Sequence, residues 1–152
     1  MILPRLFVVT ALAVVGATAT LAHEGATGVA KERMDLMQSM SKNMKEISRR
    51  INANRDLAAI GAAATRIHDT SQQIPSLFPA DSGTGITDAK PEIWQHWDEF
   101  QDKVRKLGET SAALASLGSS GDVQTVAAQF KEVIHACTSC HGEFRRGKAD
   151  RL

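Results

Sequence analysis

Residues 120–146 have the sequence SGDVQTVAAQFKEVIHACTSCHGEFRR, and this stretch decides the fold. Its apolar side chains recur at steps of three and four, which is the period of one face of an α-helix. Ser120 or Asp122 could cap the first turn of that helix. Both cysteines of the chain lie on the apolar face, whose members are Val123, Val126, Phe130, Val133, Cys137, Cys140 and Phe144.

Three segments upstream show the same spacing. We expect helices over about residues 27–52 and 56–74, and a third helix that begins at Pro91 and stops at Gly118. Four helices with one apolar stripe each can bury those stripes only against one another. The sequence therefore predicts an all-α domain, an antiparallel up-down-up-down four-helix bundle. The long link over residues 75–90 is expected to cross an end or side of the bundle.

The N-terminus predicts export. A short positive start is followed by an uninterrupted apolar stretch over residues 6–16, which is typical of a signal peptide. That stretch is shorter than the roughly 20 apolar residues of a membrane-spanning helix. We assign residues 1–22 to the signal peptide and residues 23–152 to the mature domain, and expect a periplasmic protein without a membrane span after cleavage.

The charge balance narrows the range of partners. Removing residues 1–22 removes one arginine and no acid, which leaves 17 basic and 17 acidic residues. A nucleic-acid partner is not expected, because proteins that bind nucleic acids usually carry a clustered basic excess. The near-neutral balance favours neither a monomer nor a homodimer. No catalytic base, nucleophile or phosphate loop emerges, so we expect a protein that is not an enzyme.

The motif Cys137-Thr138-Ser139-Cys140-His141 matches the attachment pattern of c-type haem, in which two thiols form thioethers and the adjacent imidazole binds iron. At helical pitch, both cysteines and the histidine point to one face. We therefore predict one covalently bound haem attached through Cys137 and Cys140, with His141 as an axial ligand of the iron. Because the cysteines lie on the inward stripe and His141 lies beside it, the haem should be inside the bundle with one edge partly exposed.

Other uses of the cysteine pair fit the sequence less well. A structural zinc site needs four ligands, and the chain has only this cluster. A thioredoxin-like redox pair would lie near a βαβ pattern, which is missing here. A disulfide between helical positions three apart is geometrically awkward. A helical bundle without cofactor that serves as an interaction module is a further alternative.

The chain resembles class II c-type cytochromes, the cytochrome c-prime group, and is most similar to its low-spin, methionine-ligated members. The resemblance covers the whole mature chain, through residues 33–37, 90–94 and 137–145. In the family an aromatic residue, usually Tyr, and then a basic residue follow the ligand histidine after two positions. Here these are Phe144 and Arg145, and the change to Phe removes a phenol hydrogen bond.

The second axial ligand decides the function. Met37 is about ten residues, or roughly 15 Å, into the first helix, and His141 is about eight residues, or roughly 12 Å, from the end of the last. In an up-down-up-down bundle these positions are nearly level. The low-spin proteins that this chain resembles use a methionine at this position, so we predict that Met37 is the distal ligand. Alternatively, the methionines of this helix only fill the core, and some five-coordinate members carry a methionine there without bonding it.

An iron with both axial sites filled mainly carries electrons, whereas an open site can bind a small gas. The leading hypothesis is therefore periplasmic electron transfer with redox partner proteins. The alternative is a five-coordinate protein that binds nitric oxide or carbon monoxide.

Two arginines are candidates for contact with the haem. The family counterpart of Arg33 lies near the haem carboxylates, and the alternative for Arg33 is a solvated helix charge. Arg145 is four residues after His141 and could shield the haem or tune the histidine. Alternatively, Arg145 only belongs to a basic C-terminal turn, where a positive charge interacts favourably with the helix dipole.

Overall fold

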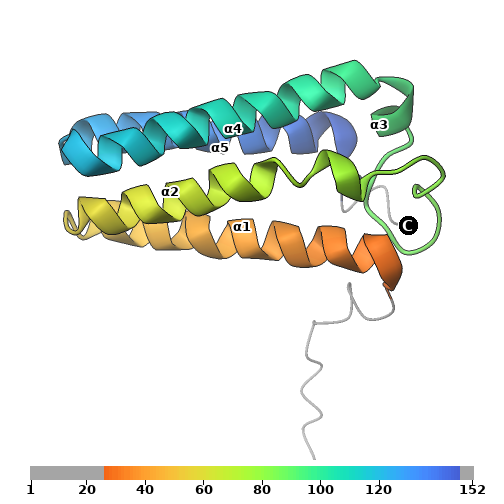
Figure 1. Ribbon diagram of the computed structural model, residues 1–152, viewed down its shortest axis with the longest axis horizontal. Helices are drawn as coiled ribbons and strands as arrows, with labels where there is room; N and C mark the ends of the chain where they lie inside the picture. The colour runs from red at the N-terminus through yellow and green to blue at the C-terminus, as the bar shows by residue number, and fades with distance from the viewer. Residues whose placement is uncertain (1–25, 148–152) are drawn as a thin grey trace, which may run out of the picture.

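The computed structural model describes residues 26–147, and four long helices carry its fold (Figure 1). Extended pairing in this range is limited to a single bridge between Ala89 and Arg145. The predicted all-α four-helix bundle is confirmed, whereas the signal peptide expected over residues 1–22 lies outside the described residues. The long helices are α1 (Gly28–Asn52), α2 (Leu57–Ser71), α4 (Trp97–Ser120) and α5 (Val123–Phe144).

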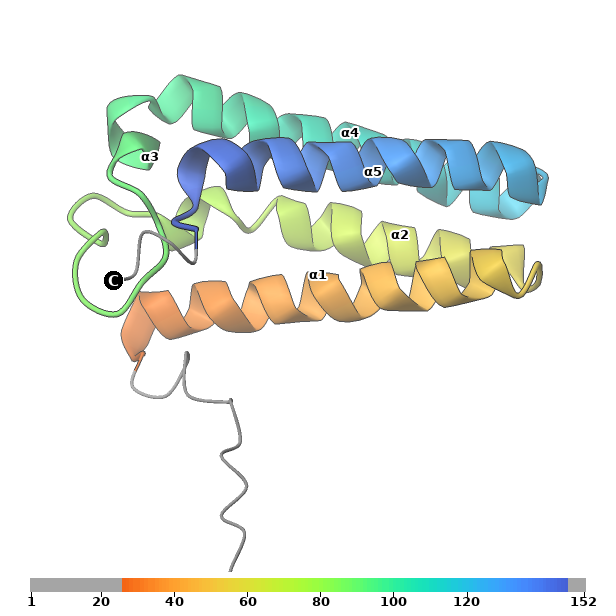
Figure 2. The ribbon, with the colours of Figure 1, turned by 180° about the vertical axis from the view of Figure 1, so that it is seen from behind.

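Consecutive long helices run in opposite directions (Figures 1 and 2). Tight turns join α1 to α2 and α4 to α5 at one end of the bundle. The connection from α2 to α4 contains η1 (Pro75–Leu77) and α3 (Glu92–Gln95) and lies at the other end. That end also holds the start of α1 and the end of α5. The up-down-up-down order, with these two helix ends level, is confirmed.

Two aspartates cap the starts of α2 and α5. Asp122 accepts hydrogen bonds from the backbone N–H groups of Gln124 (2.8 Å) and Thr125 (3.0 Å). Asp56 accepts one from the backbone N–H of Ala59 (3.2 Å). These bonds satisfy N–H groups that have no partner within the helix itself. Of the two residues predicted to cap the last helix, Asp122 is the one that does so.

A pair of glycines allows α2 and α4 to approach each other closely. Both Gly61 and Gly118 are buried, and a Cβ atom on Gly118 would lie 2.5 Å from the Cα of Gly61. The prediction that the third helix stops at Gly118 is wrong, because α4 continues to Ser120 and Gly121 caps its end. Gly118 is needed for helix packing and not for helix termination.

The third helix is divided in two. The sequence predicts one helix from Pro91, whereas the structure separates α3 from α4 at His96, which has φ −120° and ψ 51°. The cause is a tertiary contact. The indole N–H of Trp94 donates to the carbonyl oxygens of Phe78 (3.2 Å) and Pro79 (2.9 Å), which ties α3 to the preceding loop.

The second helix is shorter than predicted. α2 ends at Ser71, three residues before the predicted end at Ile74. Pro75 explains the early end, because its ring would clash with the carbonyl group of Ser71 in a continued helix. Ile74 is nevertheless 3% exposed, so the turn after α2 keeps the apolar stripe in the core.

The core is apolar and draws on all four long helices. One fully buried residue from each of them illustrates this: Ile47, Ile60, Leu114 and Val133. The predicted stripes of the four segments therefore meet in one core. Within residues 26–147, no helix combines the length and the apolar character that crossing a membrane requires.

We expect Gly118→Ala to destabilise the holoprotein by about 1–3 kcal/mol, because the added methyl group would force α2 and α4 apart. Thermal unfolding followed by circular dichroism measures this change. Ala113→Ser, at an exposed position of the same helix, is the control and should change stability by less than about 0.5 kcal/mol. An unchanged melting temperature in Gly118→Ala would contradict the close approach of the two helices.

Candidate haem-binding site

A groove lies between α1 and α5 near the end of the bundle where α1 begins. These two helices share few direct contacts, whereas α2 and α4 pack along each other. The groove consists of two cavities of about 340 Å³ and 230 Å³. The two cavities are parts of one space, because five residues line both of them: Met37, Ser41, Phe100, Cys140 and His141.

The last turns of α5 form one wall of the groove. Cys140 and His141 line both cavities, and Cys137 lines the smaller one. Both thiols are half-buried and are not joined to each other. Burial raises the pKa of Cys137, and burial together with the neighbouring Cys137 raises the pKa of Cys140 to about 11. Both groups are therefore protonated thiols at neutral pH.

The zinc and redox-pair alternatives gain no support from the structure. Residues 26–147 contain no group of three or more His, Cys, Asp or Glu residues that could hold a metal ion. The cysteines lie within an α-helix and no βαβ unit is present in this part of the chain.

His141 lies in the last turn of α5. His141 is exposed as a whole residue, but partial loss of water around its imidazole lowers the pKa of His141, and the positive charge of Arg145 lowers it further. The ring is therefore neutral at neutral pH, which is the form in which histidine binds a metal.

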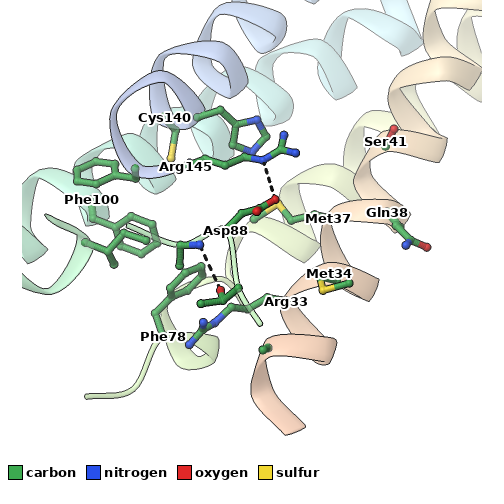
Figure 3. Close-up of a pocket in the computed structure, with 16 residues that line it drawn as sticks. Arg33, Met34, Met37, Gln38, Ser41, Phe78, Asp88, Phe100, Cys140 and Arg145 are labelled. Atoms are coloured by element: carbon green, nitrogen blue, oxygen red, sulfur yellow. Dashed lines mark hydrogen bonds and ion pairs between the residues drawn. The ribbon is translucent and has the colours of Figure 1, made fainter. Parts of the chain in front are cut away.

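Methionines of α1 form the opposite wall (Figure 3). Met34 lines only the larger cavity, while Met40 and Met44 line only the smaller one. Met37 is half-buried and lines both. Among the methionines of this stripe, Met37 is therefore the one that shares the whole groove with His141.

Arg33 is buried, with 5% of its surface exposed, although it also lines the larger cavity. Its Nε donates to the carbonyl oxygen of Leu77 (2.5 Å), its Nη1 donates to the carbonyl oxygen of Ser82 (2.9 Å), and its Nη2 donates to the Ser82 hydroxyl. The guanidinium lies over the ring of Phe78 at 4.3 Å (Figure 3). Burial lowers the pKa of Arg33. The alternative that Arg33 is a solvated helix charge is wrong.

Arg145 follows the end of α5 and lines the larger cavity. Its Nε lies 3.7 Å from a carboxylate oxygen of Asp88, which lines the same cavity (Figure 3). The side chain of Arg145 is 49% exposed, so this ion pair contributes little to stability. Arg145 is thus placed both at the C-terminus of α5 and at the rim of the groove.

Several lining residues were not among the predicted site residues. Phe78 and Phe100 have ring centroids 4.9 Å apart, and Phe100 meets Phe144 edge to face at 5.5 Å. These rings give the groove an apolar floor. Phe78 and Asp88 come from the long link, which carries no sequence signal that would place them in the site.

The residues around the groove fit a covalently attached haem. The walls offer two thiols for thioether bonds, a neutral imidazole and a thioether sulfur, which are ligand types found at haem iron. The floor is aromatic and apolar, and Arg33 and Arg145 are among the residues that line the larger cavity. An apolar macrocycle that carries carboxylates needs this combination of surfaces.

Comparison with known proteins agrees with this fit. A family model described as Cytochrome C' matches residues 28–145. The chain is 33% identical to cytochrome c' of Rhodopseudomonas palustris over 95% of this chain and 98% of that protein. It is 32% identical to cytochrome c-556 of Agrobacterium fabrum, over 81% and 84% of the two chains.

A solved structure has the same fold at lower sequence identity. It is the nitric oxide complex of a mutant of cytochrome c prime from Alcaligenes xylosoxidans, which superposes with a TM-score of 0.71 at 23% identity and covers 78% of this chain and 94% of that chain. The chain therefore belongs to the cytochrome c' family of class II c-type cytochromes, four-helix bundles that carry one covalent haem c.

Proposed function

We propose that this protein is an electron carrier in which Cys137 and Cys140 hold the haem, while His141 and Met37 are the axial ligands of its iron. The observation that carries the proposal is that Met37 and His141 line the same groove from opposite walls. The bound haem supplies an iron that accepts and releases one electron. With both axial positions filled, the site is suited to electron transfer and not to the binding of small molecules.

The attachment residues are supported by their place on α5. Cys137 and Cys140 are three residues apart in a continuous helix and both line the smaller cavity. One edge of a planar cofactor in the groove can therefore meet both sulfur atoms. The thioether bonds would form by addition of each S–H across a vinyl group of the haem, with the hydrogen passing to the vinyl carbon, and would leave the sulfur atoms as parts of the apolar wall.

We expect Cys137→Ser/Cys140→Ser to lose the covalent link to haem. After denaturing electrophoresis, the wild-type band should keep its haem stain and the double variant should lose it. Ser139→Ala, between the two cysteines, is the matched control and should keep the stain. A wild-type protein without a stained band would instead favour a bundle that works without a cofactor.

The distal ligand is supported by comparison of the methionines. A thioether must share the cavity with His141 to complete the coordination, and Met37 does so in both parts of the groove. Met40 is 6% exposed and belongs to the core cluster. Met34 lines only the larger cavity, together with Arg33.

Replacement of Met37 by Ala should convert a low-spin oxidised spectrum into a high-spin one, because the iron loses its sixth ligand. Visible absorption spectra of the oxidised and reduced holoprotein measure this change. Met34→Ala and Met40→Ala are the controls and should stay low-spin. A wild-type protein that is already high-spin would refute ligation by Met37.

Binding of nitric oxide or carbon monoxide is the second candidate function. A mutant of the similarly folded cytochrome c prime from Alcaligenes xylosoxidans is known as a nitric oxide complex, and this supports the second candidate. In the present chain such a ligand would enter the groove beside Met37. The two candidates therefore differ in whether Met37 must leave the iron first.

Titration of the reduced holoprotein with carbon monoxide separates the two functions. We expect slow and weak binding by the wild type, because Met37 must dissociate before the gas can bind, and fast binding by Met37→Ala. Met34→Ala should behave as the wild type. Immediate stoichiometric binding by the wild type would favour the gas-binding function.

The two arginines are proposed to face the carboxylates of the haem. Arg33 is a buried cation for which the part of the chain that the structure describes provides backbone oxygens, a hydroxyl and aromatic rings. An anionic group in the groove would offset the cost of burying that charge. Arg145 lies at the rim of the same cavity and adds a second positive charge.

The proposal also includes the localisation, the domain bounds and the partners of the protein. Residues 1–22 would direct the protein to the periplasm as a signal peptide, and residues 23–152 would form the mature domain. Redox proteins would be the partners, nucleic acids would not, and the domain would act as a monomer or a homodimer. The protein would pass electrons without converting a substrate, and would therefore not be an enzyme.

A further inference from the structure

The loop over residues 77–90, here named the strap, lies across the end of the groove. It connects the α2 side of the bundle to α3, and four of its residues line the larger cavity: Phe78, Thr87, Asp88 and Ala89. The strap also contacts both helices that form the walls of the groove. The first part of the strap contacts α1, and its last part contacts the end of α5.

Arg33 attaches the first part of the strap to α1. One guanidinium group donates to the carbonyl oxygens of Leu77 (2.5 Å) and Ser82 (2.9 Å) and to the Ser82 hydroxyl. That hydroxyl in turn donates to the carbonyl oxygen of Pro79 (2.6 Å). The guanidinium also covers the ring of Phe78. A single side chain of α1 therefore holds a compact turn of the strap.

Backbone hydrogen bonds attach the last part of the strap to the end of α5. The N–H of Lys90 donates to the carbonyl oxygen of Phe144 (3.0 Å), and the N–H of Arg146 donates to the carbonyl oxygen of Asp88 (2.8 Å). The Arg146 side chain donates to the carbonyl oxygen of Thr87 (3.0 Å). This attachment begins three residues after His141.

The strap is thus a bridge between two helices that have few contacts of their own. Arg33 lies one helical turn before Met37, and Phe144 lies one turn after His141. Each attachment point is therefore on the same helix as a proposed ligand and close to it. Displacement of the strap from either helix would free the two walls to move relative to each other.

We propose that Arg33 is a positioning residue, which sets the place of Met37 relative to His141 by holding the strap against α1. The proposal rests on the proposed function, because it concerns the methionine ligand. The role needs arginine, since the planar guanidinium offers several donors in a fixed arrangement, whereas lysine offers one compact ammonium group. Arg33→Lys therefore keeps the positive charge toward the haem carboxylates. It removes the set of hydrogen bonds from the guanidinium to Leu77 and Ser82 of the strap.

The test compares Arg33→Lys with the wild-type holoprotein in two measurements. Hydrogen exchange, read by mass spectrometry in peptides that contain Lys90 or Arg146, reports the attachment of the strap to α5. We expect it to be about tenfold faster in the variant, because hydrogen bonds to a charged group are lost at the other attachment. The oxidised visible spectrum should show a larger high-spin fraction. Arg105→Lys on α4 is the matched control and should change neither measurement.

Ser82→Ala tests whether the changes in Arg33→Lys come from the lost contact with the strap and not from a folding defect. Ser82 is not among the residues that line the groove, so its change leaves the haem surroundings intact. It should shift both measurements in the same direction but less. The double variant should be no worse than Arg33→Lys alone, because both changes break the same contact.

The outcomes separate this proposal from the proposed function. A low-spin wild type with unchanged exchange or an unchanged spectrum in Arg33→Lys would overturn the positioning role and leave ligation by Met37 intact. A high-spin wild type would overturn ligation itself, and the positioning of Met37 with it. Faster exchange together with a larger high-spin fraction would support both.

Discussion

The close packing of α2 against α4 is the constraint on which the rest of the structure depends. Gly61 and Gly118 let the two backbones approach, because no side chain separates them there. Gly108, which is also on α4, has no side chain where this helix faces Ser71 of α2. α1 packs against α2, and α5 packs against α4, so the outer helices are attached to different members of the inner pair. The groove is the space that remains between them.

The chemistry proposed for the groove comes from two helices that carry different types of side chain. Helical periodicity places two thiols and an imidazole of α5 on one side of the helix, within little more than one turn. α1 runs in the opposite direction and presents a thioether at the same level. Because both sets of groups are on helices, their relative positions depend on how those two helices are held together, and the strap takes part in this through its hydrogen bonds to both of them.

Burial of Arg33 links the site to the loop at its end. A buried cation is tolerated only where its donors are satisfied, and here the oxygens of Leu77 and Ser82 accept from the guanidinium. The loop that provides these oxygens is also hydrogen-bonded to the residues that follow His141. The same side chain therefore lines the cavity, orders the loop and connects the two walls.

The sequence by itself determined the helices and the bundle, and it predicted the residues of the proposed site. These features depend on local periodicity: the apolar stripes repeat within each helix, the thiols and His141 share a motif, and the level of Met37 follows from residue counts. Periodicity also has limits. It misassigned Gly118 as a helix stop, because a glycine required by a neighbouring helix has the same local appearance as one that ends a helix.

Only the tertiary structure decided which distant residues meet. It broke the third helix at His96 through the hydrogen bonds of Trp94, brought Asp88 to Arg145, and placed Arg33 under the loop instead of in solvent. Each of these contacts joins segments that are many positions apart in the chain. The local sequence does not encode them, because their geometry depends on how four helices and one long loop pack together.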